Sequence, residues 1–394
     1  MKKLTMIGSG SYRSSLSIRL VSIAHQMASQ GFEVTVIVPS ADKYNNFTKE
    51  VVRQDGPIKI VQPWQPSTHS QILNLIPYLF TSLLAGIQSR PDYIYLYKPT
   101  PISIFGIMLK FLFHVPLSLD LDDLGSEVMH AENQNVFLTK LVEMSEKISL
   151  RFSTNFVVTS TYLQQIVSTR YPLKPILLLP NGVDIDLYDY RKETPLRPNV
   201  YYFGMINRLS LIEPLLNAAP EILRNIPDAK FTIIGGGKEL ESAQKIVTKL
   251  GISNSVIFTG MTGILGALPY TQFGDIGICY QPDIKTVRAA SNMKVFQYMA
   301  MSTVPVVSKV GDLPNYLNNE TAGNSVLAGR DDLLTKTITG LLVDTETRRN
   351  KALVARNLAE TTYSWNALGL LVSDFVKNKS KNDNSMIDIQ KELS

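Results

Sequence analysis

Three carboxylates follow one short apolar segment, since Asp120, Asp122 and Asp123 come directly after Leu117–Leu119. An apolar run of this kind is typical of a buried strand. Active-site loops of open α/β sheets lie beyond the carboxyl ends of the strands. A carboxylate at such a place can orient a substrate hydroxyl group. The structural alternative is that Asp122 or Asp123 caps the next helix, and we favour a catalytic role for one of these two.

A second group of polar residues surrounds the start of an expected helix, Ser291–Ala300, which leads into the buried strand Val304–Val307. The first N–H groups of a helix have no partner within it and carry partial positive charge. Ser291, Asn292 and Met293 stand at that position, and Lys294 lies one turn further on. Together they predict a site that can hold a diphosphate.

Further polar residues belong to the same segment. Gln297 follows Lys294 by three residues and therefore lies on the same helix face. Its amide can bond the hydroxyl groups of a sugar or a ribose. Lys285 and Arg288 add positive charge just upstream. The structural alternative is an amphipathic helix whose charged side chains are simply solvated.

Glycine turns end several of the expected strands: Gly8-Ser9-Gly10, Gly204, Gly235-Gly236-Gly237 and Gly260. The first opens like a dinucleotide fingerprint, but Arg13 stands where the third glycine belongs. The first acidic residue after the second expected strand that could bind a ribose is Asp42, beyond Pro39 and Ser40. The backbone N–H groups at Gly8–Gly10 can bind a hydroxyl or phosphate group. A tight turn with no ligand is the structural alternative. A nicotinamide dehydrogenase is the function that such a fingerprint would indicate, and it ranks third, behind the two alternatives given at the end of this section.

Composition excludes several classes of protein. The 394 residues are 44% hydrophobic and 19% charged, which indicates a packed chain of about two domains. One cysteine, Cys279, excludes a disulfide framework, a cysteine-rich zinc site and an iron–sulfur cluster. Four histidines without HExxH spacing predict no metal site. The net charge is +5, and the sequence contains no dense run of lysine and arginine, so we expect no nucleic-acid partner. The small excess of positive charge predicts a mildly basic face that can bind phosphates or anionic lipid.

Short apolar strands alternate with helical stretches along the chain, which predicts parallel sheets in doubly wound α/β domains. A polar segment, Tyr188–Pro198, separates two such series and is expected to be a linker. We therefore predict a first Rossmann-like domain over 1–190 and a second over 191–360. A helix over 361–377 and a disordered polar tail over 378–394 follow. Ligands are expected in the cleft beyond the strand ends.

Two longer apolar stretches bear on membrane association. Ile72–Ile87 carries Asn74, Pro77 and Ser82, and Ile102–Leu119 carries Lys110, His114 and Pro116. Both fall short of the roughly 20 clean apolar residues that a span needs. We interpret them as buried helices and strands, with a monotopic protein as the alternative. The apolar run after Lys2 and Lys3 is too short for a signal peptide.

Five segments resemble, in order, the sequence landmarks of GT-B glycosyltransferases of the retaining family 4 type. The resemblance covers residues 3–375. The most specific match is to the family's P-x-K-x-F-E-Y-M-A-x-G-x-P-V-V, at Lys294, Phe296, Tyr298, Met299, Ala300, Pro305, Val306 and Val307. The others are Val115–Leu124 (V-P-x-V-x-x-x-H-D), Leu179–Asp184 (L-P-N-G-V-D), Pro227–Gly235 (P-x-A-x-L-x-I-x-G) and Phe258–Gly260 (F-x-G).

The resemblance implies two Rossmann-like domains, of which the first binds an acceptor and the second a nucleotide-sugar. It also implies metal-independent transfer with retention, without a cofactor, and a last helix near Tyr363–Val376 that returns to the first domain. Cations and helix N-termini stabilise the leaving diphosphate, and the candidates are Lys294 with Arg208 or Arg288. The donor-binding residues expected are Gly204, Gly235, Gly236, Gly260, Arg288, Ser291, Asn292, Met293 and Gln297. Those of the acceptor cleft are Gly8, Ser9, Gly10, Lys98 and Asp120.

The chain departs from the family pattern at several positions. The family's E-x7-E pair falls on Ala289 and Gln297, neither of which is a carboxylate. Its G-R-x-x-x-x-K-G pattern reads Gly204 to Leu211, with Arg208 out of register. Asp122 stands where the family has its histidine. These departures bear on sugar recognition and on activity.

We therefore expect a glycosyltransferase that moves a sugar from a nucleotide-sugar to a glycan or lipid-linked saccharide, in surface polysaccharide synthesis. One alternative is a weak or inactive GT-B protein that partners another transferase. The other is a nucleotide-sugar 2-epimerase. We expect a cytoplasmic protein. The alternative is a protein attached peripherally to the inner face of the plasma membrane.

Overall fold

The computed structural model describes residues 1–11, 17–39, 51–64, 71–123, 125–131, 135–188, 197–271 and 275–378. Arg13, Asp42, most of the expected linker and residues 379–394 of the expected tail lie outside these ranges. The chain forms two compact units, Met1–Pro180 with Trp365–Ser394, and Asn181–Ser364. The first of these segments ends at Pro180, ten residues before the domain boundary that was expected at residue 190.

The first unit contains an eight-stranded sheet in the order β3-β4-β2-β1-β5-β6-β7-β8. Its strands are parallel except β3, which runs antiparallel to β4 and was not predicted from the sequence. The strand order reverses between β1 and β5, which makes their carboxyl ends the place where a ligand is expected. The strand bounds are β1 Lys2–Gly8, β2 Phe32–Ile37, β3 Val51–Asp55, β4 Ile58–Gln62, β5 Tyr93–Tyr97, β6 Leu117–Leu121, β7 Asn155–Val158 and β8 Ile176–Leu178.

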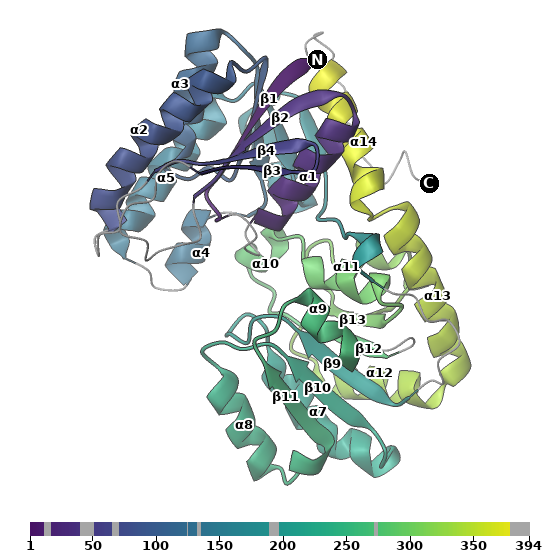
Figure 1. Ribbon diagram of the computed structural model, residues 1–394. Coiled ribbons are helices and arrows are strands. Elements are labelled where there is room, and N and C mark those ends of the chain that lie inside the picture. Colours follow the sequence, from purple (N-terminus) through teal and green to yellow (C-terminus); the bar gives the residue numbers. More distant parts are fainter. Residues whose placement is uncertain are drawn as a thin grey trace. The chain divides into compact units, whose positions relative to one another are not determined.

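Helices cover both faces of this sheet. Figure 1 shows α1 and α14 on one face and α2, α3 and α5 on the other. Every residue of β5 and β6 is buried, as parallel strands between two helical layers require. The helix bounds are α1 Ile18–Ser29, α2 Gln71–Ser89, α3 Ser103–Phe113, α4 Gly125–Ala131, α5 Val136–Phe152, α6 Thr161–Arg170 and α14 Trp365–Asn378.

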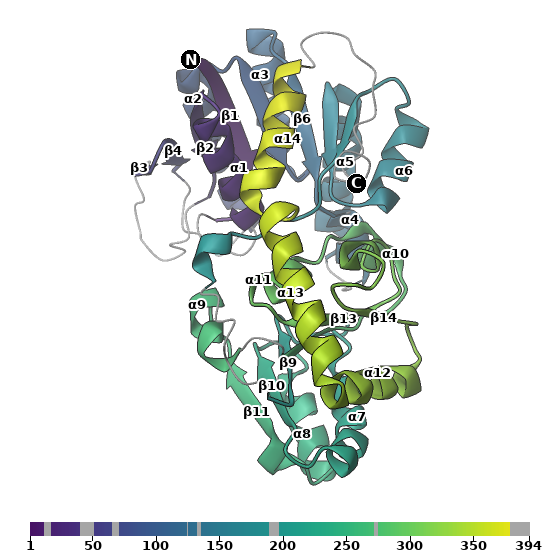
Figure 2. The ribbon, with the colours of Figure 1, turned by 90° about the vertical axis from the view of Figure 1, so that its right-hand side faces the viewer.

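The last described helix belongs to the first unit although it comes at the end of the chain. Trp365, Leu368, Val372 and Phe375 of α14 lie buried in one core with the apolar side of α1. The two helices pack closely, since a Cβ atom at Gly369 would lie 2.3 Å from Gln26 Cβ. Figure 2 shows α14 running alongside α1.

The second unit contains a six-stranded parallel sheet in the order β11-β10-β9-β12-β13-β14. Its strand order reverses between β9 and β12. Helices α7, α8 and α12 share one core, and α11 and α13 share another. The strand bounds are β9 Asn199–Phe203, β10 Lys230–Ile234, β11 Val256–Gly260, β12 Ile276–Cys279, β13 Val304–Ser308 and β14 Asn324–Val326.

The chain passes from the second unit back to the first between two helices. The helix expected over 361–377 corresponds to α14, which begins at Trp365 after α13 ends at Thr361. Between them Tyr363 accepts a hydrogen bond from the Val183 N–H, and Ser364 pairs with Val183 as a β-bridge. The helix bounds are α7 Ile212–Asn225, α8 Leu240–Lys249, α9 Ile264–Ala267, α10 Lys285–Ala289, α11 Met293–Ala300, α12 Asp331–Val343 and α13 Thr345–Thr361, with the 3-10 helices η2 Ile185–Leu187, η3 Ser253–Ser255, η4 Leu268–Tyr270 and η5 Asn315–Leu317.

Candidate active site

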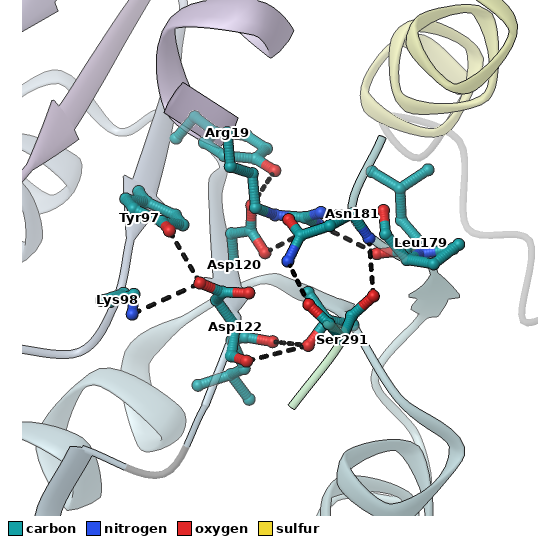
Figure 3. A network of polar contacts seen from close by, with 12 residues as sticks. Arg19, Tyr97, Lys98, Asp120, Asp122, Leu179, Asn181 and Ser291 are labelled. Carbon is teal, nitrogen blue, oxygen red and sulfur yellow. Dashed lines mark hydrogen bonds and ion pairs between the residues drawn. The ribbon is translucent and has the colours of Figure 1, made fainter. Parts of the chain in front are cut away.

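Aspartates and a lysine meet where β5 and β6 end in the first unit. The two strands pair with Tyr97 opposite Asp120, so the residues just beyond them are neighbours. The Tyr97 hydroxyl donates to Asp122 Oδ2 at 2.8 Å, and Lys98 Nζ donates to Asp123 Oδ2 at 2.7 Å. Lys98 Nζ is also 3.3 Å from Asp122 (Figure 3). These side chains remain partly exposed, so this cluster can meet a ligand.

The backbone holds Lys98 at the end of β5. Its φ of +63° is in the left-handed region, and its N–H donates to the Asp120 carbonyl at 3.0 Å. This turn directs the side chain to the two aspartates rather than along the strand. Burial opposes the charge on Lys98, but Asp122 and Asp123 outweigh it, so the pKa of Lys98 is raised. The ammonium group therefore stays charged at neutral pH.

Asp120 has a different environment from the other two aspartates. Its side chain is fully buried, and Arg19 binds it with two hydrogen bonds, Nε–Oδ2 at 2.8 Å and Nη2–Oδ1 at 3.1 Å. The Tyr95 hydroxyl donates to the same carboxylate at 2.7 Å. Arg19 also donates to the carbonyls of Leu179 and Pro180 (Figure 3). This burial is at odds with the place in an acceptor cleft that the sequence analysis gave to Asp120.

Arg19, Tyr95 and Tyr97 were not among the residues expected at the site. The hydroxyls of the two tyrosines, which lie on β5, nevertheless hold Asp120 and Asp122. One available signal was their position on a buried strand beside the strand that ends in aspartates. Another was an arginine among the apolar residues of the first helix.

The glycine turn after β1 is required for packing. A Cβ atom at Gly8 would lie 2.5 Å from Leu20 Cδ2, so glycine lets α1 approach the strand. Gly10 is also buried, while Ser9 is half-buried. Residues 12–16, which lead into α1, lie outside the described part of the chain. The structure therefore supports the tight turn and leaves a ligand role for Gly8–Gly10 as a prediction.

In the second unit, β9 and β12 separate at the point where the strand order reverses. They pair only at Val200–Ile276 and Tyr201–Gly277. Beyond this, the Tyr298 hydroxyl bridges them, since it accepts from Phe203 N at 3.0 Å and donates to the Ile278 carbonyl at 3.0 Å. This tyrosine lies on α11, so the bridge fixes that helix at the strand ends.

Lys294 lies one helical turn before Tyr298. Its Nζ donates to the Tyr202 hydroxyl at 3.1 Å and lies 4.4 Å from the centre of that ring. A Cβ atom at Gly204 would be 3.4 Å from Lys294 Nζ, so the ammonium lies beside the glycine that ends β9. Burial opposes its charge, but the neighbouring Tyr202 oxygen outweighs burial and raises the pKa of Lys294. The lysine therefore brings positive charge to the reversal point of the sheet.

Three glycine loops pack together beside Lys294. Gly204 N–H donates to the Ile234 carbonyl at 2.9 Å, and Gly235 N–H donates to the Gly260 carbonyl at 3.0 Å. A Cβ atom at Gly235 would lie 1.9 Å from Gly204 O, so no side chain fits there. The same holds for Gly237, whose Cβ would lie 2.3 Å from Ile206 O. The ends of β9, β10 and β11 thus present bare backbone, as phosphate-binding loops do.

Two other predicted donor residues, Ser291 and Gln297, have partners within the unit. Ser291 Oγ accepts from the Asn181 N–H at 2.9 Å, and the Ser291 carbonyl accepts from Asn181 Nδ2 at 2.7 Å (Figure 3). Gln297 is only 7% exposed, and its side chain bonds the buried Tyr188 hydroxyl. Both therefore fasten the chain around α11, and the predicted contact of Gln297 with a ribose disagrees with its burial.

The two predicted arginines lie in surface ion pairs. Arg208 is 89% exposed, and its Nε is 3.7 Å from Glu239 Oε1. Arg288 binds Asp283 through two hydrogen bonds of 2.6 and 2.8 Å. Asn292 and Met293 stand at the cap and first position of α11, as expected. Of these cations, Lys294 is the one that the structure places among the glycine loops.

Within the ranges that the structure describes, no three His, Cys, Asp or Glu side chains are grouped to hold a metal ion. In the same ranges, every helix is too short or too polar to cross a bilayer.

Two family models match successive parts of the chain. The model described as Glycosyltransferase Family 4 matches residues 16–187, and that described as Glycosyl transferases group 1 matches residues 188–357. Among curated proteins, the GDP-mannose-dependent alpha-(1-6)-phosphatidylinositol monomannoside mannosyltransferase of Mycolicibacterium smegmatis is 24% identical over 255 residues. The counterpart in Mycobacterium tuberculosis is 23% identical over 235 residues. These matches cover 59 and 56% of this chain and 65 and 60% of the relatives' length.

Solved structures share the whole architecture. A sucrose-phosphate synthase from Thermosynechococcus elongatus superposes with a TM-score of 0.75 at 16% identity, over 97% of this chain and 100% of that one. Anabaena HepE in complex with UDP and glucose gives 0.71 at 14% identity, over 96 and 100%. WaaG, a glycosyltransferase involved in lipopolysaccharide biosynthesis, gives 0.69 at 13% identity, over 95 and 99%. Together with the two family models, which follow one another from residue 16 to 357, these likenesses show that the chain belongs to the GT-B glycosyltransferases.

Proposed function

We propose that this chain is a metal-independent, retaining glycosyltransferase that moves a hexose from a nucleoside diphosphate sugar to a lipid-linked saccharide. The observation that carries the proposal is Lys294 among the glycine loops at the reversal point of the second sheet. A charged lysine beside loops without side chains can approach a leaving diphosphate and stabilise the negative charge that develops on it. The mannosyl transfer named for the mycobacterial relatives makes GDP-mannose the first donor to test.

The first unit supplies the polar groups for the acceptor in this proposal. Asp122 or Asp123, held by Tyr97 and Lys98, orients the acceptor hydroxyl. The bond between the sugar C1 and the diphosphate oxygen breaks, a bond from C1 to the oxygen of that hydroxyl forms, and the hydroxyl proton passes to the leaving diphosphate. Such a transfer needs no metal where lysine and backbone N–H groups meet the diphosphate charge, so activity is expected to persist in EDTA. We assign the reaction to surface glycan synthesis on the cytoplasmic side of the membrane.

Thermal shifts with UDP, GDP, ADP and CDP test the donor site. A ligand at about 100 times its dissociation constant stabilises a fold by roughly 2.7 kcal/mol. We expect one nucleoside diphosphate to raise the melting temperature of the wild type, and the rise to be lost in Lys294→Ala. Lys245→Ala is the matched control, because its side chain is exposed and lies in a surface ion pair with Glu241. An equal shift in wild type and Lys294→Ala would contradict the assignment.

Two positions favour a second candidate, a GT-B protein that binds nucleotide-sugar without turning it over. Ala289 is fully buried and has no polar group, and Gln297 is buried against Tyr188. Neither supplies the carboxylate that the family pattern has there. A transfer assay separates the candidates. GDP-mannose or UDP-glucose is incubated with the protein and lipid extracts as acceptor, and mass spectrometry detects any glycosylated product. Nucleotide binding without any sugar transfer would favour the second.

A further inference from the structure

One side of the first unit exposes many large apolar side chains. They lie on the outward surfaces of α2, α3 and α5, and we name this set the α2/α3/α5 face. Its members are Ile76, Phe80, Leu84, Ile87, Met108, Phe111, Leu112, Val136, Phe137, Met144 and Phe152. On α2, Ile76 is 69% exposed and Phe80 is 62% exposed. A contiguous apolar surface of this extent on one domain marks an interaction site.

The three helices are neighbours, so their outward residues form one surface. Helix α3 packs against both α2 and α5 (Figure 1). The approach of α2 to α3 is close, since a Cβ atom at Gly86 would lie 2.3 Å from Leu109 Cδ1. On the other side, the rings of Phe111 and Phe152 are 5.5 Å apart. On α2 the exposed apolar residues recur every three or four positions, which places them on one stripe.

The charges on this face are all of one sign. Helix α2 contains no charged residue. The outward stripe of α5 alternates apolar residues with Lys140, Lys147 and Arg151. Among the described side chains of the three helices, no Asp or Glu is at an exposed position. Glu143 and Glu146 of α5 are half-buried and bind His130 and Ser126.

Further cations gather at one edge of the face, where α3 and α5 end. Lys110 Nζ donates to the Phe152 carbonyl at 2.6 Å, and Lys174 Nζ donates to the carbonyls of Arg151 and Ser153 at 2.7 Å each. Burial, with repulsion from Lys110 and Arg151, lowers the pKa of Lys174 to about 8. An anionic partner at this edge would relieve that repulsion.

We propose that the α2/α3/α5 face docks onto an anionic lipid bilayer, with its apolar side chains in one leaflet and its lysines and arginines at the headgroups. A lipid surface accepts scattered apolar residues without shape complementarity, and neighbouring basic side chains extend to the phosphates. The absence of acidic residues from the exposed positions of these helices suits lipid phosphate. The inference deepens the proposed function and rests on it, because it supplies the surface from which a lipid-linked acceptor is reached.

Vesicle sedimentation of the full chain tests the docking. We expect the wild type to sediment with phosphatidylcholine vesicles that contain 30% phosphatidylglycerol, and weakly with phosphatidylcholine alone. The double variant Ile76→Glu/Phe80→Glu is expected to bind at least ten-fold more weakly. The double variant Lys140→Glu/Lys147→Glu is expected to bind anionic vesicles about five-fold more weakly per substituted residue, because each lysine lies near a charged surface. Its binding to phosphatidylcholine vesicles should not change.

Val343→Glu is the matched control. Val343 is 67% exposed, like Ile76, but lies on α12 of the second unit. It should bind vesicles like the wild type. Because all substituted side chains are exposed, melting temperatures should stay within a degree or two of the wild type. Failure of the wild type to bind anionic vesicles, or equal binding by Ile76→Glu/Phe80→Glu, would overturn the proposal.

The same samples separate this proposal from the proposed function. A thermal shift with nucleoside diphosphate reports on the second unit and should be unchanged in Ile76→Glu/Phe80→Glu. A nucleotide shift without vesicle binding contradicts the docking face alone, whereas vesicle binding without a nucleotide shift contradicts the donor site alone. A concentration-dependent dimer in light scattering that Ile76→Glu/Phe80→Glu abolishes would assign the face to a second copy instead.

Discussion

The three aspartates that follow β6 differ in their partners, and this decides what each can do. Asp120 is enclosed by Arg19 and Tyr95, so it cannot reach a ligand without breaking a buried ion pair. Asp122 and Asp123 share Lys98 and keep part of their surface exposed. Their carboxylate oxygens beside Lys98 can accept hydrogen bonds from hydroxyl groups.

The first prediction concerns Asp122. Asp122→Asn should lower the transfer rate by 10²-fold or more, because removal of a positioned carboxylate commonly has an effect of this size. The nucleotide-induced thermal shift should not change, since the residue belongs to the first unit. Initial rates with saturating donor measure this, and Glu143→Gln on α5 is the control. A rate within three-fold of the wild type would remove Asp122 from the mechanism.

The second prediction concerns Cys279, which ends β12. It is fully buried, and burial raises the pKa of its thiol to about 11, although Lys294 opposes this shift. Only the thiolate reacts readily, so the native protein should not react with a thiol reagent at pH 8. Full labelling is expected in guanidinium chloride. Rapid labelling of the native protein would show that the strand ends around Cys279 are open to solvent.

At the scale of elements, the glycine loops pack backbone against backbone, so closely that no side chain fits between them. Gly237 has a φ of +149° and lies against the backbone of Ile206. The Ile206 N–H in turn donates to the Gly236 carbonyl at 2.9 Å. Each loop therefore sets the position of the next.

The third prediction follows from this contact. Gly237→Ala should destabilise the second unit by about 1–3 kcal/mol through backbone strain and should weaken nucleotide binding. Gly340→Ala is the matched control, because a Cβ atom there meets open space in the exposed side of α12. That change should stabilise the helix by up to about 1 kcal/mol. Urea unfolding of both variants measures this, and equal stability of Gly237→Ala and wild type would contradict it.

The Arg19–Asp120 pair connects α1, β6 and the end of β8 in one unit. The two residues are 101 positions apart in sequence, and both are buried. A buried charge that loses its partner is strongly destabilising, whereas an apolar pair of similar volume is often tolerated.

The fourth prediction is a double-mutant cycle on this pair. Arg19→Met should destabilise the first unit by about 3–5 kcal/mol, because it leaves a buried carboxylate alone. Arg19→Met/Asp120→Leu should recover a large part of that loss. Fluorescence of the buried Trp365 during urea unfolding reports on this unit. Additive effects of the two substitutions would show that the ion pair is not coupled.

At the scale of the whole molecule, the chain leaves the first unit at Pro180 and returns to it at Trp365. The returning helix α14 fills the core beside α1 with five buried apolar side chains. Each contributes roughly 1.5–3 kcal/mol, and together they approach the total stability of a typical domain.

The fifth prediction is that a chain ending at Ser364 has an unfolded or aggregating first unit. The second unit, which retains all its strands, should still melt cooperatively. Circular dichroism during heating and limited proteolysis would show this. A chain ending at Asn378 is the control, because it retains α14. Wild-type stability of the chain ending at Ser364 would refute the structural role of the helix.

Much of this organisation follows from local sequence patterns. Alternating apolar strands and helices predict the two parallel sheets, because periodicity depends on neighbours in sequence. The segment from Ser291 to Val307 likewise predicts Lys294 at a helix start before a buried strand, and the structure has α11 and β13 there. The family comparisons confirm the GT-B assignment made from these segments.

Which polar residues belong together depends on the tertiary fold. Arg19 meets Asp120, Tyr97 meets Asp122 and Gln297 meets Tyr188 because strand order brings distant segments into contact, and no local pattern encodes that order. Exposure is also non-local. The apolar residues of α2 and α3 have the composition of a core, yet part of them face outward because no described element covers them. Local sequence patterns thus predict the elements and their kind, whereas packing determines which side chains are paired, buried or accessible to a ligand.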